Sequence, residues 1–186
     1  MSKKKNYKEC NTTPFETGIR GFQNIAKYYM YYAPNIDSAQ SQKCLSDSDA
    51  DKLFDKMLRQ TGLNQKAKVI KKVQKTSFNA FSLNEEKLDF ENSCMIIDQY
   101  NSENRLHALL RHIRNAFAHG NIYVWRKKRG NYIFFVDYDK KKDKVTARIM
   151  VSENILKLWK AIIEEQLEIE NETLEEIQES DLLTIH

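Results

Sequence analysis

A short stretch of the chain, residues 109–120 with the sequence LLRHIRNAFAHG, holds three side chains suited to chemistry on a phosphodiester: Arg114, Asn115 and His119. Histidine titrates near neutral pH and can act as a general acid or base. Arginine presents a permanent charge on a planar fork of donors that fits a phosphate. Asparagine does not titrate but can orient a neighbour or donate to an oxygen. A purely structural alternative is that Arg and His near a helix C-terminus stabilise the helix dipole by about 0.3–1 kcal/mol.

The order of these residues resembles the R-x4-6-H motif of the HEPN superfamily, because Arg114 is followed by a polar residue, three further residues and His119. The surrounding sequence LRHIRNAFAHG is similar to HEPN proteins of plasmid and defence loci. In that family the motif lies late in an all-helical bundle, at the end of a core helix, and one branch carries a small β meander before the last helix. The resemblance covers residues 14–169.

The resemblance implies a metal-independent endoribonuclease that needs no cofactor. In such an enzyme the 2′-OH of RNA attacks the neighbouring phosphate, which leaves a 2′,3′-cyclic phosphate and a 5′-OH. Carried over to this chain, His119 would transfer protons, Arg114 would stabilise the charged phosphorane and Asn115 would orient the histidine. The expected biological setting is a growth-arresting toxin, or an effector of phage defence or stress response.

Two other kinds of function stay open at this point. The first is a catalytically inactive HEPN-like module that binds a nucleotide, RNA or a protein partner. A cleft shared by Arg114 and His119 and open to solvent would favour the enzyme over this module. The second is a structural protein that binds a basic partner through its acidic C-terminal tail, residues 171–186.

The spacing of the motif also predicts an assembly. Five residues on a regular helix separate Arg114 from His119 by about 140° around the axis, so the two side chains cannot easily meet at one phosphate. Either the chain leaves helical geometry near Ala118, which Gly120 permits, or a second copy supplies part of the site. HEPN-like proteins generally pair two motif helices about a twofold axis. We therefore expect a homodimer whose interface groove holds Arg114, Asn115 and His119 of both subunits.

One position departs from a known subgroup of the family. HEPN toxins that are controlled by a nucleotidyltransferase antitoxin carry a tyrosine two residues after the motif histidine, and the antitoxin modifies it. Here that position is Asn121, and the nearest tyrosine is Tyr123. This argues against the same route of control and leaves any antitoxin or regulatory partner unidentified.

Basic residues beside the motif are expected to bind RNA phosphates: Arg111, Lys127, Lys128 and Arg129. For Arg111 the simpler alternative is a solvated helix face. Aromatic side chains alternate with the basic residues of this region. They would stack on single-stranded bases or bury one face of the strands that carry them: Trp125, Tyr132, Phe134 and Tyr138.

The net charge of +4 conceals a strong segregation along the chain. Residues 161–186 hold nine acidic side chains and no Lys or Arg, which leaves 30 basic against 17 acidic side chains in residues 1–160, a net charge of +13. A basic body fits a polyanionic partner such as RNA. A lysine-rich solubilising surface would produce the same composition.

The remaining composition favours a reduced, cytoplasmic globular protein. The chain has 186 residues, enough for one domain, and its apolar runs are far shorter than the roughly 20 residues of a membrane-spanning helix. No apolar segment follows the basic N-terminus, so no signal peptide is expected. Cys10, Cys44 and Cys94 are odd in number and form no C-x-x-C pair, which argues against a disulfide framework and a zinc site.

Periodicity predicts the elements that must position the motif. Apolar residues recur at helical spacing before Gly120, and the period changes to strand-like alternation after it. The expected helices span 14–32, 46–62, 64–81, 84–100 and 101–118, the expected strands 121–126, 132–138 and 144–151, and a last helix begins after Ser152. The predicted fold is mainly α (α+β), a HEPN-like antiparallel helical bundle with a small antiparallel β meander inserted before the last helix. We expect one domain over 1–170 and an acidic tail over 171–186.

Overall fold

The structure is a computed structural model. It describes residues 21–34, 45–83, 92–127, 130–139 and 144–184, with the backbone alone for residues 127 and 173–184.

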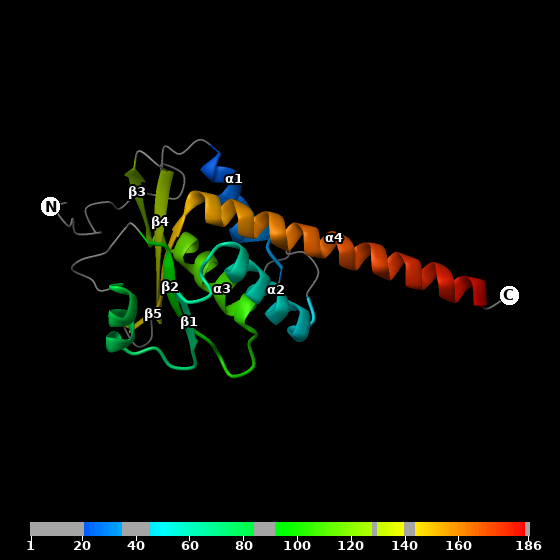
Figure 1. The fold of residues 1–186 in the computed structure, drawn as a ribbon, viewed down its shortest axis with the longest axis horizontal. Helices are drawn as coiled ribbons and strands as arrows, with labels where there is room; N and C mark the ends of the chain where they lie inside the picture. Colours follow the sequence, from blue (N-terminus) through cyan, green and yellow to red (C-terminus); the bar gives the residue numbers. More distant parts are fainter. Residues whose placement is uncertain (1–20, 35–44, 84–91, 128–129, 140–143, 185–186) are drawn as a thin grey trace.

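A five-stranded mixed sheet forms the centre of the molecule (Figure 1). Strand β1 is parallel to β2, and the remaining neighbours are antiparallel. In spatial order the strands are β1 (Ala67–Ile70), β2 (Cys94–Asp98), β5 (Lys144–Ser152), β4 (Gly130–Asp139) and β3 (Ile122–Lys127).

The sheet corrects the predicted fold class, because a helical bundle with a small β meander is wrong for this chain. The three predicted strands exist as β3, β4 and β5, but β2 extends them by pairing with β5, and β1 then pairs with β2. The range 64–81, predicted as a helix, holds β1 and the 3-10 helix η3 (Lys75–Phe81). The described end of the predicted helix 84–100 is β2. Its apolar run, residues 94–97, is buried throughout, and so short a run fits a central strand as well as a helix.

Helices pack on one face of this sheet (Figure 1). They are α1 (Phe22–Lys27), α2 (Asp47–Gln60), α3 (Arg105–Ala118) and α4 (Glu153–Thr184). Strand alternation divides the core accordingly: Ile133 and Phe135 of β4 face the helices, whereas Phe134 and Val136 belong to a second cluster with Phe78 of η3. The helical layer therefore rests on β4, where the site described below is built.

Several helix ends agree with the expected ones. The Ser46 hydroxyl accepts from the Asp49 N–H at 3.2 Å and caps α2, and Gly62 beyond its C-terminus has φ +67°. The Ser152 hydroxyl accepts from the Ile155 N–H at 3.3 Å at the start of α4. The first predicted helix is present from Phe22 and continues as the π-helix η2 (Tyr28–Tyr32), while its residues 14–20 lie outside the described part.

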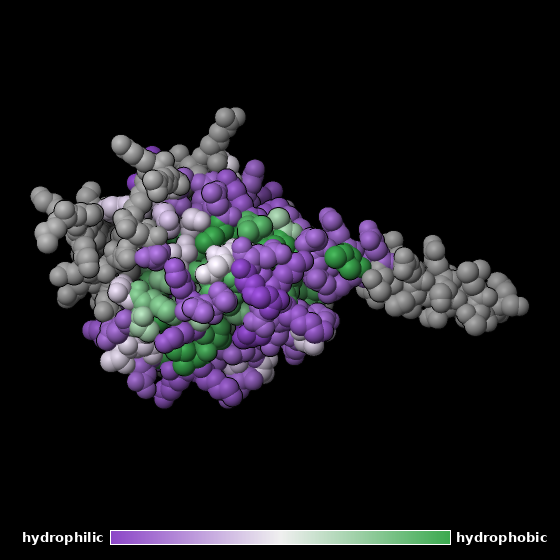
Figure 2. Space-filling model, viewed as in Figure 1, coloured by the Kyte–Doolittle hydropathy of each residue, from purple (hydrophilic) through white to green (hydrophobic). Residues whose placement is uncertain are grey.

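The last helix, α4, is 32 residues long and projects far beyond the body of the molecule (Figure 1). Figure 2 shows mostly hydrophilic side chains where it leaves the body. Among the described helices none is long and apolar enough to cross a membrane. The predicted boundary at residue 170 falls inside α4 and stays a prediction.

Candidate active site

Helix α3 carries the motif, and local sequence signals define both of its ends. The Asn104 side chain accepts from the His107 N–H at 2.8 Å and caps the N-terminus. At the other end Gly120 has φ +66°, its N–H donates to Phe117 O at 3.2 Å, and the Asn121 N–H donates to Ala116 O at 2.9 Å. This pair of bonds is a Schellman cap, for which the left-handed conformation favours glycine.

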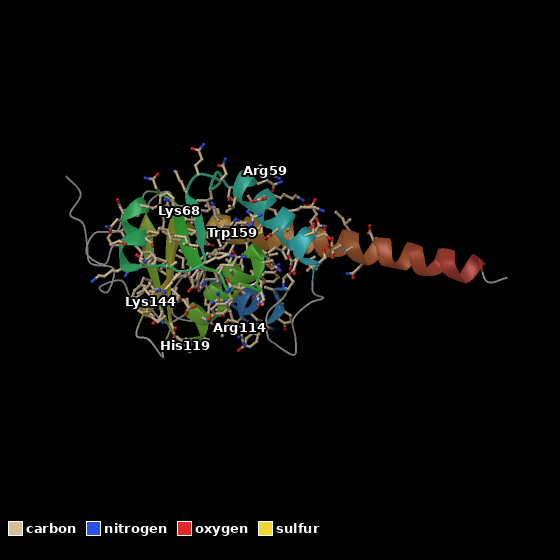
Figure 3. The ribbon with its side chains drawn as sticks, turned by 90° about the horizontal axis from the view of Figure 1, so that it is seen from below. Arg59, Lys68, Arg114, His119, Lys144 and Trp159 are labelled. Carbon is tan, nitrogen blue, oxygen red and sulfur yellow. The ribbon has the colours of Figure 1, made fainter. Side chains whose placement is uncertain are left out.

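The motif residues occupy the C-terminal part of α3. Arg114 and Asn115 are half-buried, whereas His119 is exposed and forms the C-cap of the helix with φ −102° and ψ 3°. Figure 3 shows Arg114 and His119 along the same edge of the molecule, opposite Arg59. Helix α3 ends at Ala118 and the backbone of His119 is no longer helical, so the separation of about 140° between Arg114 and His119 holds only for a regular helix. The departure from helical geometry near Ala118 that the sequence allowed is thus present, and the need for a second copy stays a prediction.

Asn115 is held from the sheet side. Its Nδ2 donates to Asp137 Oδ2 at 3.1 Å. Asp137 lies on β4, is 3% exposed, and accepts at its other oxygen from the backbone N–H of Tyr138 at 2.9 Å. The amide of the motif asparagine is thus fixed by a buried carboxylate on a different element.

His112, on the neighbouring turn of α3, is fully buried between two aspartates. Nδ1 lies 2.7 Å from Asp137 Oδ2, and Nε2 lies 2.9 Å from the backbone oxygen of Asp98 and 3.1 Å from its Oδ1. Each ring nitrogen faces carboxylate or carbonyl oxygens, an arrangement that favours an imidazolium, which donates from both nitrogens. Burial alone would lower the pKa of His112, but the hydrogen bonds with Asp137 and Asp98 outweigh burial and raise it.

A family model described as HEPN pEK499 p136 matches residues 50–173, which is more than half of the chain. The chain belongs to this HEPN family. Searches of the curated proteins and of the solved structures each found no match. The match makes the protein a HEPN-type module, a class that is generally nuclease- or toxin-like.

The HEPN match includes every group of the buried network. It begins within α2 and runs through the whole sheet and α3 into α4, so Asp98, His112, Asn115 and Asp137 all lie inside it. Helix α1 and η2 precede the matched range and yet pack on α3, where Phe22 meets the Phe117 ring at 6.0 Å between centroids. The HEPN core of this chain is therefore completed by a segment outside the match.

Arg111, predicted to bind RNA, is engaged by the protein itself. Its guanidinium bonds the Glu103 carboxylate at 2.7 and 2.9 Å, lies 3.5 Å from Asp98 Oδ1, and stacks 4.1 Å from the centroid of Tyr100. Its side chain is only 17% exposed, so the alternative of a solvated helix face is wrong. Burial would raise the pKa of Glu103, but the bond from Arg111 is the main cause that lowers it. The RNA contact of Arg111 stays a prediction.

The other predicted RNA-binding residues lie at the β3–β4 hairpin. Lys127 ends β3, and Lys128 and Arg129 lie outside the described residues. Phe134 is buried, and Trp125, Tyr132 and Tyr138 are partly buried against the second core cluster, as expected of aromatic residues that cover one face of the strands. Stacking on RNA bases by the three partly buried rings stays a prediction.

Sequence reasoning did not find the roles of Asp98, His112 and Asp137. One signal was present for Asp137: it shares the helix-facing side of β4 with Ile133 and Phe135, and a lone acid on a buried apolar face needs a partner. Asp98 carries no such signal, because the periodicity of its segment predicts a helix. Among the described residues no group of His, Cys, Asp and Glu side chains is arranged to hold a metal ion.

Proposed function

We propose that this HEPN protein is a metal-independent endoribonuclease that acts as a growth-arresting toxin or as an effector of phage defence or stress response. The observation that carries the proposal is the arrangement at the end of α3. A histidine that is free of carboxylate partners among the described residues stands exposed at the helix end, and a buried carboxylate holds the motif asparagine one turn earlier. An arginine lies at the same edge of the molecule (Figure 3).

In the proposed reaction one proton leaves the attacking 2′-OH and another is added to the leaving 5′-oxygen. The ribose 2′-OH loses its proton to a histidine acting as general base, its oxygen bonds to phosphorus, and the bond from phosphorus to the 5′-oxygen breaks. The leaving oxygen takes a proton from a general acid. The products are a 2′,3′-cyclic phosphate and a 5′-OH. Arg114 stabilises the negative charge that gathers on the phosphorane oxygens.

This chemistry also favours the proposed homodimer. One histidine cannot be neutral base and charged acid for the same phosphate at once, whereas two copies of His119 across a twofold axis supply both. A twofold pairing of two α3 helices would also let an arginine of one subunit meet a histidine of the other. RNA and a second copy of the chain are the proposed partners.

A substrate with one altered sugar tests the nucleophile. Cleavage of an end-labelled RNA at a mapped site should persist in EDTA and stop when that single ribose is replaced by deoxyribose, with cleavage at other sites unchanged as the internal control. Cleavage that EDTA abolishes and magnesium restores would contradict a metal-free reaction. Binding of RNA without any cleavage would instead support the inactive binding module.

Dilution tests the composite site. Sedimentation across a concentration series should show a dimer, and activity per chain should fall as the dimer dissociates. A monomer with undiminished activity at every concentration would rule out a site built from two subunits.

A further inference from the structure

The contact between Asn115 and Asp137 joins the motif helix to the sheet. Asn115 lies on α3 and Asp137 on β4, 22 residues later in the chain, and Nδ2 of the first lies 3.1 Å from Oδ2 of the second. The same Oδ2 accepts from His112 Nδ1 at 2.7 Å, and Oδ1 accepts from the Tyr138 N–H. With three donors around it, the carboxylate has no freedom to turn.

Charged and polar groups surround the Asp137 carboxylate, which is 3% exposed. A buried carboxylate is costly unless it is paired and hydrogen-bonded. The groups that face His112 are Asp137 from β4, Asp98 from the end of β2 and Arg111 from its own helix. On one side of the ring, the positive charge of a protonated His112 balances the Asp137 carboxylate. On the other side, Arg111 balances the Asp98 carboxylate.

We propose that Asp137 is a positioning residue of the ribonuclease site, which orients the Asn115 amide and through it the end of α3 that carries His119. This inference rests on the ribonuclease activity proposed above. A carboxylate can only accept, so the amide must turn its nitrogen to Asp137. That leaves the Asn115 oxygen and its second N–H as the groups that the amide offers to His119 or to the RNA.

Asp98 provides a matched control within the same network. It bonds the opposite nitrogen of the same imidazolium, yet among the described residues its partners are His112 and Arg111 and not Asn115. Asp137→Asn and Asp98→Asn therefore each remove one negative charge from His112 at nearly constant volume. Only Asp137→Asn also disturbs the contact with the motif asparagine, because both oxygens of Asp137 face donors and one of them becomes an NH2 group that cannot accept.

The first test compares these two variants under conditions where both are folded. Asp137→Asn should lower kcat by about 10- to 100-fold with little change in KM, the size of effect that a small misplacement of a reacting group produces. Asp98→Asn should stay within about threefold of the wild type, because it leaves the contact with Asn115 in place. Equal losses of kcat in the two variants would show that the network only supports the fold, and an unchanged kcat in Asp137→Asn would overturn the proposal directly.

A double-mutant cycle tests whether Asp137 affects kcat through Asn115. Asn115→Ala should lower kcat on its own, and adding Asp137→Asn to it should cost less than about twofold more, since the shared contact is already lost. A full additional loss in the double variant would show that Asp137 does not act through Asn115.

A second readout does not depend on activity. In an amide ¹⁵N NMR spectrum of the full chain, the Asn115 side-chain resonance should move in Asp137→Asn and stay in place in Asp98→Asn. If the wild type cleaves no RNA while the resonance behaves in this way, the proposed function has failed and the positioning contact stands. If the wild type cleaves RNA but the Asn115 side-chain resonance does not move in Asp137→Asn, the positioning contact is contradicted and the proposed ribonuclease activity is supported.

Discussion

The two ends of α3 carry similar side chains in very different surroundings. Toward the N-terminus, Arg105 bonds Asp51 at 3.1 Å and Asp55 at 2.8 Å, and Arg111 bonds Glu103 at 2.7 Å. In the middle, His112 lies fully buried between two aspartates. At the C-terminus, His119 stands exposed beyond the last turn.

The difference shows that residue type does not separate buried, carboxylate-paired groups from exposed ones on this helix. Arginine and histidine occur at both ends, and carboxylates from distant segments decide their roles. Asp51 and Asp55 come from α2, Asp98 from β2 and Asp137 from β4. These carboxylates pair with Arg105, Arg111 and His112, whereas His119 is exposed at the helix end.

Replacing single histidines of α3 by alanine should therefore produce the largest difference in cleavage activity. His119→Ala should lower kcat by about 10²–10⁴-fold, the usual contribution of a general acid or base, while the melting temperature changes little because the side chain is exposed. His107→Ala is the matched control, since His107 is also partly exposed on α3 and lies 4.0 Å from Glu103. Cleavage assays and thermal unfolding of both variants check this. A clear loss of stability in His119→Ala with activity retained would support the helix-dipole alternative.

The buried histidine, His112, should instead change how the free energy of unfolding depends on pH. The pKa of folded His112 lies above its ordinary value of 6.5 because the bonds to Asp137 and Asp98 outweigh burial, so the folded state holds the proton more tightly than the unfolded state. The stabilisation is complete below pH 6.5 and is lost as the pH rises through the folded pKa, by up to about 1.4 kcal/mol per pH unit. Urea unfolding from pH 6.5 upward measures this slope.

His112→Asn is the variant that should flatten the slope. Should it fail to fold, NMR titration of the His112 ring in the wild type gives the same information, because its pKa must lie above 6.5. A ring that titrates below that value would contradict the charged network.

Local signals accounted for some of the fold and missed its centre. Ser46, Gly62 and Gly120 mark helix ends through their own backbone chemistry, and the alternation of residues 144–151 is that of a strand. Helix α3 begins at Arg105 after the Asn104 cap and not at the predicted residue 101. The strand β2 has no such signature, because a central strand buried on both faces is simply apolar. Its identity depends on pairing with β5, about 50 residues later in the chain. The mixed sheet could therefore not be predicted from the periodicity of short windows.

The same limit applies to the site. Arg114, Asn115 and His119 lie within six consecutive residues, so their pattern is readable in the sequence. Asp137 reaches Asn115 only because β4 runs beneath α3, as the edge contact of the Phe117 and Phe135 rings at 5.3 Å shows. A partner that is supplied by tertiary packing leaves no local spacing to recognise.

The smallest effect is expected at the N-terminal end of α3. Arg105 forms a two-pronged ion pair with Asp55 and a further bond to Asp51, but its side chain is 33% exposed, and solvent screens such pairs. Arg105→Gln should lower the free energy of unfolding by about 0.5–1 kcal/mol and leave kcat unchanged. Lys52→Gln, which breaks an exposed pair with Asp49, is the control and should cost less. Urea unfolding and cleavage assays measure the two effects. A fall in kcat for Arg105→Gln would mean that the N-terminal end of α3 also contributes to cleavage, and would contradict the distinction between its two ends.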